Sequence, residues 1–215
     1  GRVPLDEAAL LGCAALTGVG AVLFAARMAA GASALVVGAG GVGLFAVQGA
    51  LIAGAEVVVA ADPVAERRQQ ALALGATHAG HPDEIETLVR EVAPDGVDYA
   101  FDAVGSAATA VIALALTRSH GTVVLVGIPP VGTRLDLDPA LFLRREKWLT
   151  GTMYGSEDPA VALPILLDHV AAGRLVLRPL LGRSFALDDV NAAVAHSLAG
   201  APGRAIVRPG VSSPT

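Results

Sequence analysis

The chain has 215 residues, of which 53% are hydrophobic, so it is long and apolar enough to bury one large core. It carries 15 Lys and Arg residues against 20 Asp and Glu residues, and this net charge of -5 without a basic block argues against nucleic acid as a partner. The single cysteine excludes an intramolecular disulfide, and no stretch has the pattern of a signal peptide, so a reducing, cytoplasmic location is expected.

Two uncharged stretches, residues 8–26 and 29–55, are long enough to raise the question of membrane-spanning helices. Much of the mean hydropathy of +0.60 comes from alanine, and four glycines between residues 38 and 43 interrupt the second stretch. Because strand-like and helix-like segments alternate along the rest of the chain, the pattern predicts an α/β protein outside the membrane.

The alternation predicts six strands separated by helices. Strands are predicted at residues 33–38, 56–62, 77–81, 96–105, 121–130 and 147–155, with helices at 41–55, 63–76, 82–93 and 106–120. The strands are near-continuous apolar runs, as expected for parallel strands buried on both faces. The fold class expected is therefore α/β, a doubly wound six-stranded parallel Rossmann sheet.

Both ends of the chain lie outside this pattern. A helix is predicted at 157–173, a strand at 180–187, a helix at 188–200 and a strand at 204–209. We interpret residues 1–18 as a junction segment, 19–154 as the domain that holds the six-stranded sheet, and 155–215 as a segment that packs back towards the junction. The two flanking parts are expected to be remnants of a second domain.

A glycine motif opens the first long helix. Gly38, Gly40 and Gly43 stand in the order G-x-G-x-x-G directly after a strand, where the first allows a tight turn, the second lets a pyrophosphate approach, and the third lets the helix pack on the sheet. The free N–H groups and the dipole at the start of that helix favour phosphate. In this context the motif predicts dinucleotide binding.

The second strand ends on Asp62, which lies 19 residues after Gly43. An acid at this place can accept hydrogen bonds from the adenosine ribose, and it favours NAD over NADP because it repels a 2′-phosphate. Two other interpretations stay open: Asp62 could cap the helix that follows, and Arg67 or Arg68 could hold that phosphate. For Arg68 a solvated helical face is preferred.

With these residues in place, the chain resembles the C-terminal part of the zinc-dependent medium-chain alcohol dehydrogenase family. The resemblance rests on the segments "LLGCAALTGVGAV", "VVGAGGVGLFAVQGA", "AADP", "LGATH", "GVDYAFDAVG", "GTVVLVGIPP" and "GRAIV", in that order, from about residue 4 to 207. It implies hydride transfer between NAD and an alcohol or aldehyde substrate. The alternative is a stand-alone NAD-binding module without catalytic activity.

The resemblance also implies which residues contact the cofactor. On the nicotinamide side these are Thr17, Val42, Val126, Gly127, Ile128, Met153 and Tyr154. On the pyrophosphate and adenosine side they are Gly40, Gly41, Asp62, Arg67, Val104, Gly105 and Arg204. Val104 and Val126 could instead be core residues, and Arg204 could be a surface charge.

Cys13, the only cysteine, has two interpretations. A free cysteine is usually a small buried apolar residue. The resemblance implies instead that Cys13 is one of three protein ligands of a catalytic zinc whose other ligands lie in an N-terminal domain that this chain lacks. His78 and His81 are interpreted as exposed polar residues, so zinc is expected only in a parent protein that has the missing domain.

One protein partner is expected. The sixth strand, at residues 147–153, is mostly uncharged and is the last of the sheet, so it has a free edge. In the family that the chain resembles, this edge pairs with its twofold copy, which implies a homodimer.

Overall fold

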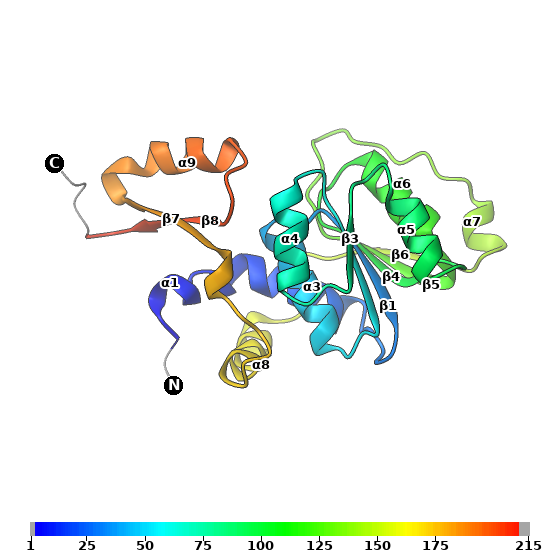
Figure 1. Cartoon of the computed structure of the whole chain (residues 1–215), viewed down its shortest axis with the longest axis horizontal. Coiled ribbons are helices and arrows are strands. Elements are labelled where there is room, and N and C mark those ends of the chain that lie inside the picture. The colour runs from blue at the N-terminus through cyan, green and yellow to red at the C-terminus, as the bar shows by residue number, and fades with distance from the viewer. Residues whose placement is uncertain (1–2, 211–215) are drawn as a thin grey trace.

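The computed structural model describes residues 3–210, and its centre is a six-stranded sheet in which every pair of neighbours is parallel. The strands are β1 (Ser33–Val37), β2 (Val57–Ala61), β3 (His78–Gly80), β4 (Val97–Asp102), β5 (Thr117–Leu125) and β6 (Trp148–Gly151). Their order is β3-β2-β1-β4-β5-β6 (Figure 1). β2 and β3 are added on one side of β1 and the last three strands on the other, so the strand order reverses between β1 and β4. The predicted doubly wound sheet is confirmed. In such sheets ligands bind at the carboxyl ends of the strands, where the order reverses.

Helices cover both faces of the sheet. One hydrophobic cluster joins alternate strand residues to α3 (Gly41–Ile52), α4 (Ala65–Ala73) and the N-terminal helix, and a second joins the other strand residues to α5 (Ile85–Val92) and α6 (Ala107–Leu116). Neighbouring residues of β1 therefore point into different clusters: Val36 into the first and Leu35 into the second. This double burial explains why the strands read as continuous apolar runs.

The N-terminal helix is continuous in outline but irregular. It comprises α1 (Leu5–Ala8), the π-helical η1 (Leu11–Ala15), α2 (Leu16–Gly20) and the π-helical η2 (Ala21–Ala25). The 21-residue span Leu5–Ala25 is long and apolar enough to cross a membrane by length and composition, a test that buried core helices also pass. In its most apolar window 56% of the residues are buried inside the protein. At Gly18 the helix approaches α3 so closely that a Cβ atom would collide with the carbonyl oxygen of Val42.

The C-terminal part forms a further layer, and its residues Ala162, Leu166 and Leu180 belong to the first hydrophobic cluster. After β6 come η3 (Tyr154–Ser156), α8 (Pro159–Ala171), η4 (Arg178–Leu180), β7 (Leu181–Ala186), η5 (Leu187–Asp189), α9 (Val190–Leu198) and β8 (Arg204–Arg208). β7 and β8 pair in parallel as a two-stranded sheet, which Figure 1 shows beside α1 and away from the main sheet. The side chain of Arg208 forms an ion pair with Asp6, which ties β8 to α1.

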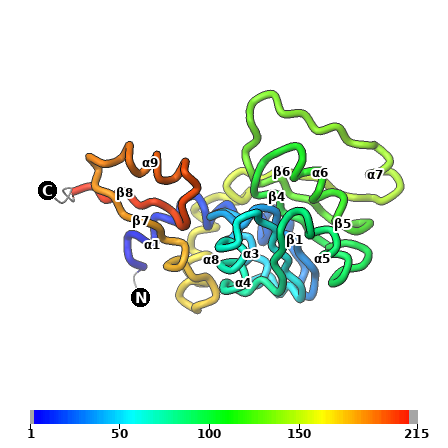
Figure 2. Tube along the Cα trace, turned by 45° about the horizontal axis from the view of Figure 1, so that its top comes forward, coloured from blue at the N-terminus to red at the C-terminus, as the bar shows by residue number. Residues whose placement is uncertain are grey.

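A long excursion joins β5 to β6. It carries the short helix α7 (Ala140–Leu143) and extends from the sheet on the side away from β7 and β8 (Figure 2). β6 ends the sheet, as predicted, and Trp148 on this strand is 70% exposed. The edge of β6 is the feature on which the predicted homodimer depends.

Several predicted helix boundaries differ from the observed ones by a few residues, and two of them have a clear physical reason. The helix predicted to reach residue 120 ends at Leu116, and β5 begins at Thr117, which pairs with Val97 of β4. His120 has a positive φ of 62°, which no α-helix accommodates. The helix predicted from residue 63 begins at Ala65, because the N–H of Val64 donates to the Asp62 carboxylate in a turn that precedes the helix.

Candidate dinucleotide-binding site

The glycine loop lies at the carboxyl end of β1, and each glycine of the motif has a distinct surrounding. Gly38 has a φ of +91°, a conformation that favours glycine, and a Cβ atom on Gly43 would collide with the carbonyl oxygen of Gly38. A Cβ atom on Gly40 would instead meet nothing within 4 Å. The fold therefore requires Gly38 and Gly43, whereas Gly40 leaves open space at the start of α3 that a phosphate would fill.

The Asp62 carboxylate lies under this loop. Its side chain is only 3% exposed; Oδ2 accepts a hydrogen bond of 2.9 Å from the N–H of Ala39, and Oδ1 accepts one of 2.9 Å from the N–H of Val64. Each oxygen retains a lone pair for a ribose hydroxyl. The N-terminal cap of α4 is Val64, which makes no side-chain cap bond, so the interpretation of Asp62 as the helix cap is wrong.

Two arginines follow Asp62 on α4 and do different things. Nη1 of Arg67 lies 3.7 Å from Oδ2 of Asp62, and its Nη2 donates to the carbonyl oxygen of Gly200 at 3.2 Å. Arg68 donates from Nη1 to the carbonyl oxygens of Asp62 and Pro63 at 2.8 and 3.0 Å. Arg68 is half-buried, and the prediction of a solvated helical face is wrong for it because the turn before α4 presents these carbonyls.

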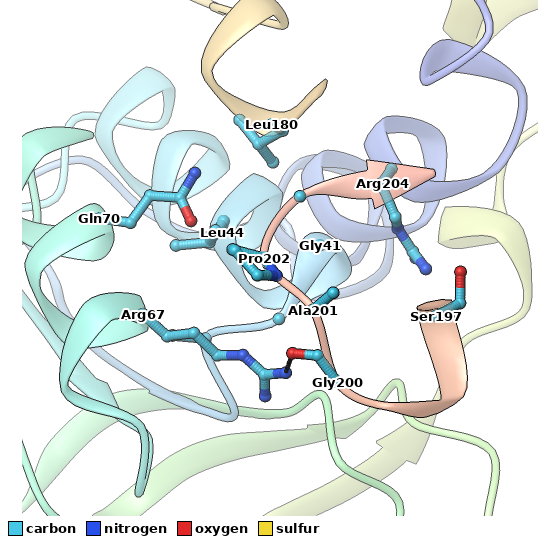
Figure 3. Close-up of a pocket in the computed structure, with 13 residues that line it drawn as sticks. Gly41, Leu44, Arg67, Gln70, Leu180, Ser197, Gly200, Ala201, Pro202 and Arg204 are labelled. Atoms are coloured by element: carbon cyan, nitrogen blue, oxygen red, sulfur yellow. Dashed lines mark hydrogen bonds between the residues drawn. The ribbon is translucent and has the colours of Figure 1, made fainter. Parts of the chain in front are cut away.

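A cavity of about 210 Å³ opens between the glycine loop, α4 and the loop that precedes β8. Arg204, at the start of β8, lays its guanidinium over Gly41, where a Cβ atom would collide with it. Figure 3 shows Arg67 and Arg204 on opposite sides of this cavity, with Ser197 beside Arg204. Two cations and the positive end of α3 therefore face one space, which favours an anion such as pyrophosphate.

A second cavity of about 310 Å³ lies where the N-terminal helix meets the ends of β4, β5 and β6. It gathers nine of the predicted residues together with Ala103 and Thr152: Cys13, Thr17, Val42, Val104, Val126, Gly127, Ile128, Met153 and Tyr154. Val104, expected on the adenosine side, lines this second cavity and is 50% exposed, so it is not a core residue. Gly41 lines the first cavity and Val42 lines the second, so the start of α3 joins them.

Cys13 is exposed and free, which overturns the interpretation of a small buried residue. Among residues 3–210 no group of three His, Cys, Asp or Glu side chains is arranged to hold a metal ion, so the residues present do not fit a complete zinc site. His78 contacts the Thr77 hydroxyl at 2.9 Å, and His81 lies 3.3 Å from the Asp83 carboxylate. Cys13 supplies one sulfur at the second cavity.

Sequence reasoning missed several residues that line the first cavity, among them Gln70 and Ser197. Gln70 carried a usable signal, because it follows Arg67 by three positions and so shares its face of α4. Ser197 carried no such signal, because it lies on α9, far along the chain from the glycine loop and from α4.

Comparison with known proteins identifies the family. The family model described as zinc-binding dehydrogenase matches residues 41–168, which is more than half of the chain. The chain therefore belongs to the zinc-binding dehydrogenase family.

Two curated relatives are dehydrogenases. The chain is 37% identical over 194 residues to the NDMA-dependent alcohol dehydrogenase of Amycolatopsis methanolica, covering 88% of this chain and 52% of that protein. It is 30% identical over 198 residues to the S-(hydroxymethyl)glutathione dehydrogenase of Paracoccus denitrificans, covering 87% of this chain and 52% of that protein. The chain thus spans about half the length of these relatives.

Solved structures share the fold over nearly all of the chain. Benzyl alcohol dehydrogenase from Acinetobacter calcoaceticus superposes with a TM-score of 0.92 at 29% identity, covering 97% of this chain and 58% of that one. A zinc-binding dehydrogenase from Sinorhizobium meliloti 1021, solved bound to NADP, gives a TM-score of 0.81 at 27% identity, with 92% and 58% covered.

Proposed function

We propose that this chain is the NAD-binding part of a zinc-type alcohol dehydrogenase that transfers a hydride between NAD and an alcohol or aldehyde. The observation that carries the proposal is the pair of cavities on either side of the start of α3. One holds Arg67 and Arg204 with the open backbone at Gly40, and the other holds Thr17 among apolar side chains. A dinucleotide has the same division, with a charged pyrophosphate and a flat nicotinamide ring.

The residues of the chain have separate tasks in this proposal. The backbone at Gly40 and Gly41 and the Arg204 guanidinium bind the pyrophosphate, and the Asp62 carboxylate accepts the hydroxyls of the adenosine ribose. The second cavity binds the nicotinamide and shields it from water, with Thr17 against one side. When bound, the nicotinamide supplies the hydride chemistry, and the protein supplies its orientation.

We assign Cys13 as one zinc ligand, because its exposed sulfur lines the same cavity as Thr17. Two further protein ligands are needed for a catalytic zinc, and they come in this proposal from a segment outside the chain. The chain alone is therefore expected to bind NAD without oxidising alcohols. The alternative is a stand-alone NAD-binding module without catalytic activity. It makes the same prediction for NAD binding, and the two proposals differ only in whether the chain is part of a protein that oxidises alcohols.

NAD is favoured over NADP because of Asp62. Its carboxylate is buried beneath the glycine loop and repels a 2′-phosphate, whereas it can accept two ribose hydroxyls. The Sinorhizobium meliloti relative was solved bound to NADP, so the preference for NAD proposed here rests on the Asp62 carboxylate and not on that relative.

Titration calorimetry of the chain with NADH and with NADPH tests the proposal. NADH should bind more tightly, and Asp62→Ala should narrow the difference by about 1–3 kcal/mol, the usual worth of hydrogen bonds to a charged group. Asp95→Ala is the matched control, because Asp95 is an exposed acid in the loop between α5 and β4. Equal or reversed affinities of the unmodified chain for NADH and NADPH would contradict the assignment of NAD as the cofactor. If the chain bound neither dinucleotide, the proposed function would be wrong.

A further inference from the structure

Asp102 is the last residue of β4 and is only 1% exposed. It lies between two loops that line the second cavity, one with Ala103 and Val104 and the other with residues 126–128. Its backbone carbonyl oxygen accepts hydrogen bonds from the N–H groups of Val126 and Gly127, at 2.9 and 2.8 Å. One carbonyl of β4 therefore holds the chain that leaves β5.

The carboxylate of Asp102 holds the other loop. Its Oδ1 accepts a hydrogen bond of 3.0 Å from the N–H of Val104 and one of 3.2 Å from the N–H of Gly105. A single residue thus accepts four backbone N–H groups, two from each loop. Buried N–H groups rarely remain unpaired, so these contacts restrict the positions that both loops can take.

The two loops also touch each other without intervening side chains. A Cβ atom on Gly105 would lie 2.5 Å from the carbonyl carbon of Gly127, and one on Gly127 would collide with the N–H of Gly105. Gly105 has a φ of +83°, a conformation rare for residues with a side chain. The loops are therefore fitted backbone to backbone, and a shift of either one displaces the other.

From these contacts we propose that Asp102 is a positioning residue for the nicotinamide half of the cofactor. The inference rests on the function proposed above, in which Val104, Val126 and Gly127 line the nicotinamide cavity. Asp102 does not line the first cavity, where the pyrophosphate is proposed to bind. Loss of the carboxylate should therefore loosen the nicotinamide cavity and leave the first cavity intact.

The test compares Asp102→Leu, which removes the acceptor, with Asp102→Asn, which retains one acceptor oxygen at the same place. Calorimetry measures the affinity for NADH and for ADP-ribose, a ligand that lacks the nicotinamide. Asp102→Leu should weaken NADH binding by about tenfold or more through the loss of two hydrogen bonds and change ADP-ribose binding by less than about threefold. Asp102→Asn should restore NADH binding. Asp136→Leu, which changes an exposed acid between β5 and α7, should leave the binding of both ligands unchanged.

The outcomes separate the two proposals. If Asp102→Leu weakens NADH and ADP-ribose equally, or Asp102→Asn fails to rescue, Asp102 has no specific role in positioning and the inference is wrong while the proposed function stands. If the unmodified chain binds neither ligand, both fail. Should Asp102→Leu not fold, amide hydrogen exchange of the unmodified chain decides: Val104, Gly105, Val126 and Gly127 should exchange slowly, and rapid exchange at the Val104 and Gly105 amides would refute the carboxylate contact.

Discussion

The stability of the chain should depend strongly on one buried side chain of α3. Gln48 is 2% exposed, and both atoms of its amide bond the backbone of Val176: Oε1 accepts from the N–H at 2.8 Å and Nε2 donates to the carbonyl at 3.2 Å. These two bonds attach the segment between α8 and η4 to the Rossmann part of the chain.

The change Gln48→Leu keeps the side-chain volume and removes both hydrogen bonds. At roughly 1 kcal/mol for each net hydrogen bond, the free energy of unfolding should fall by about 2 kcal/mol. For a chain of this size that corresponds to a drop of about 4–8 °C in Tm. Urea denaturation followed by circular dichroism measures the free energy, and calorimetry measures the Tm.

Gln69→Leu is the control, because Gln69 lies exposed on α4, where surface substitutions change stability by less than about 0.5 kcal/mol. If Gln48→Leu is no more destabilising than Gln69→Leu, the two bonds to Val176 contribute nothing measurable. The segment that carries Val176 would then be held by its apolar contacts alone.

Three further predictions concern the thiol, the sheet edge and acid stability. Cys13→Ser should leave NADH binding of the chain almost unchanged by calorimetry, and one tightly held zinc per chain in metal analysis would contradict the assignment of Cys13 as an isolated ligand. Light scattering should show a homodimer that Trp148→Glu dissociates, since a charge at an open strand edge opposes pairing; a monomer at high concentration would rule out the edge contact. Burial alone raises the pKa of Asp98, but hydrogen bonds from the Ser33 side chain and backbone and from Arg118 outweigh it and lower the pKa below its usual value. The carboxylate thus stabilises the fold above its unfolded pKa of about 3.9, and the stability lost in Asp98→Asn at neutral pH should shrink as the pH falls towards the lower folded pKa; a Tm difference that stays constant as the pH is lowered would refute this.

The strands were predictable because burial of both sheet faces leaves a strong local signal. Val57–Ala61, for example, sends alternate residues into two separate cores, so every position is apolar and the run stands out. The end of α6 was not predictable, because neither glycine nor proline marks the boundary between Leu116 and Thr117. Only pairing with β4 makes the residues from Thr117 a strand.

The candidate site was suggested by the sequence where a motif sets particular residues at a particular spacing. Gly38, Gly40 and Asp62 belong to a motif whose members lie close in sequence. Gln48 and Asp102 were missed because they are defined by their partners: Gln48 bonds a residue 128 positions away, and Asp102 bonds a loop that begins after another helix and strand. No local sequence pattern predicts hydrogen bonds between residues that lie so far apart along the chain.

Cys13 and Thr17 lie on one helix, Cys13 in η1 and Thr17 in α2, rather than on a loop. The two residues are four positions apart, about one helical turn, and both line the same cavity. The helix packs closely against its neighbours, because a Cβ atom on Gly20 would lie 2.7 Å from the Cα atom of Gly155. In the proposed enzyme, the zinc ligand Cys13 and the nicotinamide contact Thr17 therefore belong to one helix. The spacing between sulfur and nicotinamide would then depend on this helix and not on the segment that supplies the other zinc ligands.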